Sequence, residues 1–312
     1  MRKLLGTQLS ARAVRPSIAA LLLAAGVVGA SGAWANTSVT VVLSEEPEVL
    51  EPCEATRSTV GRVVKQNIAE TFTEINPADG TITPRLATAW SQVDNLTWRF
   101  ELRKGVKFHD GADFDAAAAV YAIERTMDKS MDCETRTKFF GGIKLTASAT
   151  GSYVLEIKTE KPVPIMPVMA GTIAVVSPNT PKGKATRTPI GTGPYKFVSW
   201  QPGKDVQLER FDGYWGTKPP VTKATFIWRG ESAVRAAMVK TGEADIAPNI
   251  AVQDANDSTM DFSYPNSETS RLRIDTTRPP LNNRNVRMAL NLAIDRNALR
   301  GSIFSKDVIP AT

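Results

Sequence analysis

The sequence predicts a mixed α/β fold, and three kinds of pattern support this prediction. Short segments in which apolar and polar residues alternate predict strands with one buried face, as in residues 96–103. Apolar residues spaced three or four positions apart predict amphipathic helices, as in residues 116–127. Turn residues join most strands directly into hairpins, and clear strand–helix–strand repeats are few.

The first half of the chain follows these patterns in order. Residues 37–43 are β-branched and alternating, which predicts a strand, and the apolar face of residues 60–72 predicts a helix. Residues 76–108 predict a turn, a short helix and then a hairpin. Asp115 is a suitable cap for the alanine-rich helix that runs to Met127.

Hairpins and short helices continue to the end. The later elements predicted are a hairpin over 144–163, a hairpin over 195–210 turned by Pro202 and Gly203, a strand at 224–229, a helix that stops near Gly242, a short strand at 244–247, and, within 270–304, a strand, a Pro-Pro turn and an amphipathic helix.

Residues 1–35 have the composition of a secretory signal peptide. Four basic residues and no acid accompany an apolar run at 18–28, and Ala33 and Ala35 form the small-x-small pattern of a cleavage site. No Arg-Arg pair precedes the run and no cysteine lies at the cleavage site, so we expect the Sec route and no lipid anchor. The alternative is an uncleaved anchor helix, although the run is much shorter than the roughly 20 residues that span a membrane.

Charge and length limit the function classes. The chain has 38 basic and 32 acidic residues, but four of the basic ones lie in the leader, which leaves 34 against 32. This near balance does not favour nucleic-acid binding, which needs a clustered basic surface. Removing 35 of 312 residues leaves 277, enough for one large or two modest domains.

Cys53 and Cys133 are the two cysteines. An oxidising compartment favours one disulfide between them, and closing a loop of about 80 residues could stabilise the fold by roughly 4 kcal/mol. The alternative is two unpaired thiols. Two cysteines and one histidine are too few for a typical zinc site, so we expect no metal.

The glycines at 191 and 193 raise the question of a phosphate site. No Gly-Lys-Ser/Thr ending follows them, and Pro194 removes a backbone donor that a phosphate cradle would use. A strand follows instead of a helix. We therefore expect a structural bend that leads into a hairpin.

Catalytic patterns are weak. His109, the single histidine, lies in a predicted turn, and no Gly-x-Ser-x-Gly elbow is present. Residues 254–261 lack the central glycine and terminal glutamate of a calcium loop, so a solvated loop is expected there. The aromatic residues are expected in the core, with one or two lining an apolar cleft; they include Trp90, Trp98, Tyr195, Trp200, Tyr214, Trp215 and Trp228.

Five motifs in order carry a resemblance to a known family. They are LEPCEAT (50–56), the block from PRLATAW to AIER (84–125), the block from PIGTGPYKF to TFIW (189–228), GEADIAPNI (242–250) and DTTRPPLNNRNVRMALNLAIDR (275–296). In these motifs the chain resembles the extracytoplasmic solute-binding proteins of family 5, the peptide- and nickel-type receptors of ABC importers. The match covers residues 38–303.

The resemblance implies a periplasmic binding protein-like fold of type II, with two large lobes. Residues 36–276 would form the first lobe and 277–312 the start of a second lobe. Family members are much longer, so we interpret the chain as C-terminally truncated, with lobe one mostly present and lobe two largely missing.

The resemblance also implies function. A member captures a short peptide or similar small solute by hinge closure and delivers it to a membrane permease and its ATPase, without enzymatic activity or a cofactor. We expect a periplasmic monomer. The family also binds nickel, heme, opines, sugars and glutathione.

A few site residues can be carried over from the family. Arg57 is expected to hold a carboxylate, and Asn249 and Ile250 to pair with an extended ligand; for every candidate the alternative is an ordinary surface or core residue. The ligand-binding set is Thr56, Arg57, Ser58, Phe139, Phe140, Asn249 and Ile250.

Two other functions stay open. An exported hydrolase with paired carboxylates would turn over a peptide or glycoside. A truncated remnant that binds no solute would expose apolar surface and bind hydrophobic dyes.

Overall fold

The computed structural model describes residues 37–264 and 269–310, so the predicted signal peptide lies outside the described residues. Three sheets contain the strands. The strands are β1 (Ser38–Leu43), β2 (Thr73–Ile75), β3 (Ile82–Pro84), β4 (Ala87–Asp94), β5 (Thr97–Leu102), β6 (Leu145–Gly151), β7 (Val154–Thr159), β8 (Tyr195–Gln201), β9 (Asp205–Arg210) and β10 (Lys223–Trp228). The helices are α1 (Ser58–Val64), α2 (Ala116–Met127), α3 (Met166–Ala170), α4 (Ser232–Lys240) and α5 (Arg284–Ala293), with a 3-10 turn η1 (Pro52–Glu54) and a π-helical turn η2 (Arg136–Phe140).

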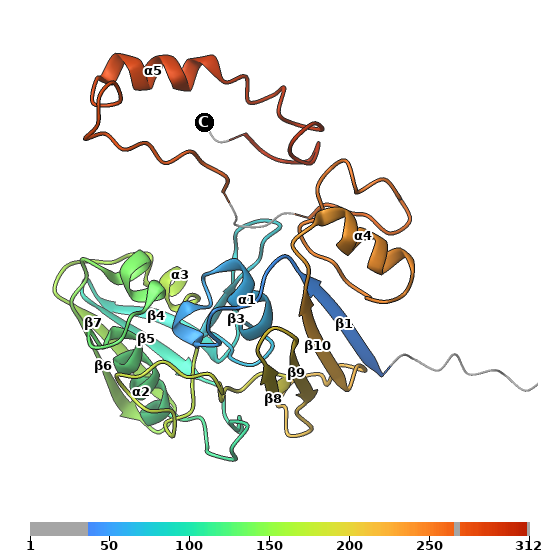
Figure 1. Ribbon diagram of the computed structural model, residues 1–312. Helices are drawn as coiled ribbons and strands as arrows, with labels where there is room; N and C mark the ends of the chain where they lie inside the picture. Colours follow the sequence, from blue (N-terminus) through green and yellow to red (C-terminus); the bar gives the residue numbers. More distant parts are fainter. Residues whose placement is uncertain (1–36, 265–268, 311–312) are drawn as a thin grey trace, which may run out of the picture. The chain divides into compact units, whose positions relative to one another are not determined.

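The first four-stranded sheet has the order β1-β10-β9-β8. Strand β1 is parallel to β10, which follows it in the chain by about 180 residues, and the other pairs are antiparallel (Figure 1). The predicted hairpin β8–β9 is confirmed, and Gly203 in its turn has a φ of 76°, which favours glycine. This sheet therefore joins the start of the described chain to residues 195–228.

The second four-stranded sheet is antiparallel, with the order β4-β5-β7-β6, and α2 packs against β6 and β7. Helix α2 is confirmed as predicted, because Asp115 Oδ1 accepts a hydrogen bond from the Ala118 amide at 2.9 Å. Ile123 of α2, with Phe100 and Leu155 from the strands, belongs to one buried apolar cluster.

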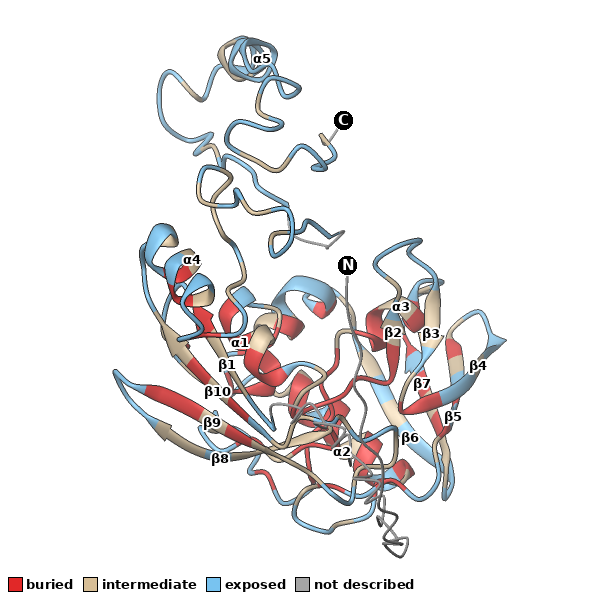
Figure 2. Ribbon diagram, turned by 90° about the vertical axis from the view of Figure 1, so that its right-hand side faces the viewer, coloured by how far each residue is buried: buried red, intermediate tan, exposed pale blue. Residues whose placement is uncertain are grey.

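A second apolar cluster lies beside the first sheet. It contains Leu50 from the loop after β1, Val63 of α1, and Val206 and Phe226 from the strands. Figure 2 shows buried residues on α1, α2 and the sheet strands, whereas α5 is mostly exposed. Helix α1 is thus held by its apolar side, and Ser58 at its N-terminal end is exposed.

Three local predictions within residues 37–264 are wrong, and tertiary contacts explain them. Helix α1 ends at Val64 instead of running to residue 72, because Gln66 adopts a left-handed φ of 62° and the chain turns toward the glycine bend. The predicted short helix before β5 is strand β4, which pairs with β5 along its length. Residues 244–247 form only one bridge, between Val41 and Ile246, in place of a strand.

The glycine bend is confirmed, and its close packing explains the residue type. A Cβ at Gly191 would lie 2.1 Å from the carbonyl oxygen of Ile68, and one at Gly193 would lie 2.2 Å from that of Asn67. The Gly193 amide donates to the Ile68 carbonyl at 2.9 Å. These glycines allow two backbone segments to touch.

Residues 269–310 carry helix α5, and none of its residues is buried. Asn283 caps the helix by accepting a hydrogen bond from the Asn285 amide at 2.9 Å. The strand expected at the start of 270–304 does not form among the described residues. The lobe boundary near residue 276 stays a prediction.

Candidate functional site

The loop between β1 and α1 is held by a buried ion pair. Arg125 of α2 donates from Nη1 and Nη2 to the two carboxylate oxygens of Glu51, at 2.7 and 2.9 Å. The amides of Cys53 and Thr186 also donate to Glu51, at 3.1 and 2.8 Å. Glu51 and Arg125 are 0% and 2% exposed, so this pair is part of the core.

Arg125 donates two further hydrogen bonds, to backbone carbonyls. Its Nε donates to the Pro181 carbonyl at 2.9 Å and its Nη2 to the Lys184 carbonyl at 3.0 Å. A buried charge is tolerated when it is paired and hydrogen-bonded in this way. The acid of the Leu-Glu-Pro motif therefore positions the loop, and it is not available to a solute.

A disulfide makes the second attachment of the loop. Cys53 and Cys133 are bonded, with their Cα atoms 5.2 Å apart and both residues buried. Each cysteine is followed directly by a glutamate, Glu54 or Glu134, and the Glu134 amide donates to Glu54 Oε1 at 3.0 Å. The disulfide thus brings two carboxylates together at the N-terminal end of α1.

Arg57 lies among these carboxylates. Its Nε is 2.7 Å from Glu54 Oε2 and 3.6 Å from Glu134 Oε2, and its Nη1 is 3.0 Å from Glu48 Oε2. Thr56, the residue before it, donates from Oγ1 to Glu134 at 2.9 Å. Thr56 and Arg57 are therefore together at one charged cluster, and Arg57 is already paired.

The two inner carboxylates have opposite pKa shifts. Burial raises the pKa of Glu54, against a hydrogen bond from the Glu134 amide and the charge of Arg57. Burial also acts to raise the pKa of Glu134, but hydrogen bonds from Lys138 and Thr56 outweigh it and lower that pKa. Glu134 is thus held as an anion by more donors than Glu54.

Ser58 and Asn249 meet through Arg62 of α1. Arg62 donates from Nη2 to Asn249 Oδ1 at 3.0 Å, and from Nη1 to Ser58 Oγ. Asn249 has a left-handed φ of 58°, and its carbonyl accepts a hydrogen bond from buried Arg235 at 3.0 Å. Ile250 follows and is half-buried. The two predicted segments, 56–58 and 249–250, are therefore connected at α1.

The two phenylalanines of η2 have different environments. Phe139 is 41% exposed, whereas Phe140 is 2% exposed and belongs to the core around α2. The prediction that Phe140 lines a solute site needs correction, because its ring is covered by protein. The side chain of Phe139 is exposed enough to contact a solute.

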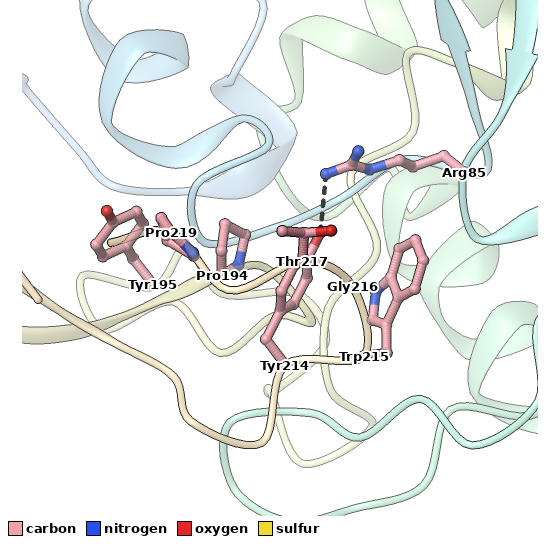
Figure 3. A pocket seen from close by; sticks show the side chains of 8 residues that line it. All are labelled: Arg85, Pro194, Tyr195, Tyr214, Trp215, Gly216, Thr217 and Pro219. Carbon is pink, nitrogen blue, oxygen red and sulfur yellow. Dashed lines mark hydrogen bonds between the residues drawn. The ribbon is translucent and has the colours of Figure 1, made fainter. Parts of the chain in front are cut away.

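A separate cavity of about 470 Å³ is lined by Arg85, Tyr214 and Trp215, which all contact the buried carboxylate of Glu70. Figure 3 shows Arg85 above the rings of Tyr214 and Trp215, and its Nη2 donates to the Tyr214 hydroxyl at 3.1 Å. Tyr195 also lines the cavity. Three of the aromatic residues noted in the sequence therefore line a cavity, as the sequence suggested for one or two.

Glu70 holds three of the residues that line this cavity in place. The sequence patterns gave no indication of this role of Glu70. It accepts hydrogen bonds from Thr192 Oγ1, Tyr214 OH and Trp215 Nε1 at 2.8, 3.0 and 2.8 Å, and Arg85 Nε is 2.8 Å from its Oε1. Burial and the charge of Glu70 raise the pKa of Tyr214. With its oxygens fully used, Glu70 has a structural role.

His109 is held in a neutral form. Its Nε2 lies 2.9 Å from the Gly193 carbonyl, to which it must donate, and its Nδ1 accepts from the Gly191 amide at 3.4 Å. Burial lowers the pKa of His109 to about 4. Among the described residues, no group of three or more His, Cys, Asp or Glu side chains could hold a metal.

Within residues 37–264 and 269–310, no helix has the length and apolar character needed to cross a membrane.

Comparison with known proteins identifies the family. The model of the bacterial extracellular solute-binding proteins, family 5 Middle, matches residues 81–312. The chain belongs to this family. The prediction from the five motifs is confirmed.

The chain is similar to binding proteins whose names or structures state a solute. The glutathione-binding protein GsiB of Pectobacterium atrosepticum is 31% identical over 311 residues, covering 93% of this chain and 59% of the relative. The ABC transporter-associated periplasmic binding protein DppA of Helicobacter pylori, solved with the peptide STSA, is 25% identical with a TM-score of 0.59, covering 66% of this chain and 45% of that one.

The fold is that of periplasmic binding proteins. A dipeptide binding protein of Pseudoalteromonas sp. SM9913, solved with Met-Leu, has a TM-score of 0.70 at 18% identity, covering 85% of this chain and 58% of that one. The α/β prediction with the type II fold is confirmed. The chain spans about 59% of the length of its curated relative.

Proposed function

We propose that this protein is the substrate-binding component of an ABC importer. It captures a short peptide or a similar small solute in the periplasm and delivers it to a membrane permease with its ATPase. Membership in the extracellular solute-binding family is the observation that carries this proposal. The relatives named for glutathione and for a bound peptide point to solutes of this size and chemistry.

The proposed contact residues are Thr56, Arg57 and Ser58 at the N-terminal end of α1, Asn249, which accepts a hydrogen bond from Arg62 of α1, and Ile250 and Phe139. The buried Glu51–Arg125 pair and the Cys53–Cys133 disulfide hold their base rigid. A rigid base that presents exposed polar groups is suited to recognition, because little ordering is required when the solute binds.

The proposed activity is binding without chemistry. His109 is neutral with both nitrogens hydrogen-bonded to backbone, and Glu51 and Glu70 are enclosed by donors. These groups are not placed to act on a solute. An exported hydrolase would instead change its substrate, so recovery of the solute distinguishes the two functions.

Thermal unfolding of the full chain, with glutathione and with the peptide Ser-Thr-Ser-Ala, tests the proposal. Ligand at about 100 times its Kd should add roughly 2.7 kcal/mol to the free energy of unfolding, which raises Tm. Mass spectrometry of the recovered solute should show it unchanged. Conversion of the solute would establish a hydrolase, and the absence of any shift with either solute would overturn the binding role.

Export is part of the same proposal. We propose cleavage after Ala35 and release of a monomer into the periplasm. N-terminal sequencing of the protein from a periplasmic extract should begin at Asn36. An intact N-terminus in the membrane fraction would favour the anchor helix.

A further inference from the structure

Arg235 of α4 carries a buried guanidinium whose partners are backbone groups. The residue is 3% exposed. Its Nη1 donates to the carbonyls of Arg229 and Gly230, at 2.8 and 2.6 Å, and its Nη2 donates to the carbonyl of Asn249 at 3.0 Å. Among the residues that the structure describes, this guanidinium hydrogen-bonds only to backbone carbonyls. One side chain thus connects two segments that are separated by the whole of α4.

Stability alone does not account for a cation in this place. Burial lowers the pKa of Arg235, while the charges of Asp254 and Glu231 act in the opposite direction. An apolar side chain could fill the same space without giving up the hydration of a charge. The planar guanidinium, in contrast, presents several donors in a fixed geometry. Its presence is therefore best explained by the carbonyls that it holds in place.

These carbonyls lie on the two sides of β1. Residues 229–230 directly follow β10, which runs parallel to β1. Ile246, on the other side, forms a parallel bridge with Val41 of β1, and Asn249 follows it in the chain. Arg235 therefore ties the chain that leaves β10 to the chain that leaves the opposite neighbour of β1.

The segment at Asn249 has a backbone conformation that needs support. Asn249 has a φ of 58°, in the left-handed region that residues with a Cβ adopt at a cost, although asparagine tolerates it better than most. Helix α4 holds this segment at two points, because Arg235 binds the carbonyl of Asn249 and Ser232 Oγ accepts from the Ala251 amide at 2.8 Å. Ile250 lies between these two points.

The backbone conformation also directs the side chain of Asn249. Its Oδ1 accepts a hydrogen bond from Arg62 of α1 at 3.0 Å, and Arg62 also donates to Ser58. We propose that Arg235 is a positioning residue for solute binding: its guanidinium holds Asn249 in the left-handed conformation that directs this side chain to Arg62. The connection from α4 thus reaches two of the proposed contacts, Asn249 and Ser58.

This inference rests on the proposed solute-binding function and goes beyond the contact residues. Arg235 is buried, so it acts on a solute only through the segment that it holds. A site that is fixed before binding requires less ordering when the solute arrives, which favours affinity. A purely structural role would lower the free energy of unfolding and leave the affinity of the folded protein unchanged.

Calorimetry on the full chain, with glutathione and with Ser-Thr-Ser-Ala, separates these two roles. Arg235→Met removes all three hydrogen bonds and keeps much of the side-chain volume. For a solute that the unmodified chain binds, its Kd should rise at least about tenfold. Arg235→Lys keeps the charge but has no planar fork for carbonyls of two segments, so its Kd should lie between the two. Circular dichroism checks that each variant is folded.

Asn249→Gly tests the same connection without disturbing the buried charge. Glycine adopts a left-handed φ readily, so the fold should keep its stability, but the bond from Arg62 is lost and Kd should rise. The double variant Arg235→Met/Asn249→Gly should bind about as weakly as the weaker single variant, because both changes break one connection. Independent roles would instead multiply the two increases in Kd.

Arg210→Met is the matched control. Arg210 of β9 also donates from Nη1 to a backbone carbonyl, that of Pro219 at 3.1 Å, and neither residue is a proposed contact. Its Kd should equal that of the unmodified chain. An equal rise in Arg210→Met would show that loss of any such bond weakens binding, which overturns the positioning role.

The remaining outcomes separate the two proposals. An unchanged Kd in the folded Arg235 variants, or a double variant whose increase is the product of the single ones, overturns the positioning role while solute binding stands. If Arg235→Met does not fold, Arg235→Lys and its combination with Asn249→Gly decide by the same criteria. Binding of neither solute by the unmodified chain overturns both proposals.

Discussion

Two ion pairs that involve the loop between β1 and α1 have opposite roles. Glu51 pairs with Arg125 and Arg57 pairs with Glu48, and both contacts are close, at 2.7 and 3.0 Å. Glu51 and Arg125 are 0% and 2% exposed, whereas the side chains of Arg57 and Glu48 are 44% and 82% exposed. The same kinds of charged group thus build a core in one case and an exposed surface in the other, although Glu48, Glu51 and Arg57 lie within ten residues of chain.

Burial explains the difference. A buried pair is expensive to break, because one charge is left without water or a partner. An exposed pair breaks at small cost, because water replaces the lost partner. The loop is therefore fixed at Glu51, whereas the exposed ion pair of Arg57 can separate at small cost.

The largest effect is expected at the buried pair. Arg125→Ala should lower the free energy of unfolding by about 3–5 kcal/mol, because Glu51 stays buried without its partner. Urea denaturation at pH 7 measures this loss. If Arg125→Ala lowered the free energy of unfolding by less than about 1 kcal/mol, the buried pair would stabilise the fold no more than an exposed pair does.

The double variant Glu51→Leu/Arg125→Met provides the control. It removes both charges and keeps apolar volume, so it should recover a large part of the stability lost by Arg125→Ala. A double variant as unstable as the single one would show that packing around Arg125, and not its charge, is the cause.

An intermediate effect is expected at His109, which is buried in its neutral form. Its pKa falls from 6.5 to about 4 in the folded protein, chiefly because of burial, while Asp110 and Lys196 act in opposite directions. Below pH 6.5 the unfolded chain binds a proton that the folded one does not. Folding should therefore lose about 2 kcal/mol between pH 7 and pH 5 from this group.

Urea denaturation at the two pH values, compared between the unmodified chain and His109→Gln, isolates that contribution. Glutamine does not titrate, so its variant should show a smaller pH dependence by about the same amount. An equal pH dependence in both proteins would mean that other groups, such as the carboxylates, cause the change.

The smallest effect on stability is expected at Arg57. Arg57→Gln should change the free energy of unfolding by less than about 1 kcal/mol, since the side chain is half exposed. Its affinity for glutathione or Ser-Thr-Ser-Ala should nevertheless fall, as calorimetry would show. Unchanged affinity would show that Arg57 does not contact the solute. The two ion pairs would then differ in burial and stability alone.

The candidate site was only partly predictable. Thr56, Arg57 and Ser58 were found from a family motif, but nothing local indicates that Glu54 and Glu134 surround Arg57. Glu134 is 80 residues from Glu54 in the chain, and the disulfide brings them together. The burial of Phe140 beside exposed Phe139 was also invisible, because adjacent aromatic residues look alike in a sequence.

The sequence by itself determined the elements whose signals are local. Helix α2 follows from its apolar spacing and its Asp115 cap, and the β8–β9 hairpin from Pro202 and Gly203. The family also follows from the order of the motifs. The helix and the hairpin depend on residues a few positions apart, so their physical causes lie within each segment itself.

Only the tertiary structure decided the rest. It ended α1 at Val64, made β4 a strand by pairing it with β5, and enclosed Glu51 and Glu70. The free energy of a charge depends on its burial and partners, and those partners come from segments up to 145 residues away, as Trp215 does for Glu70. Local pattern cannot carry that information, because burial is a property of the assembled chain.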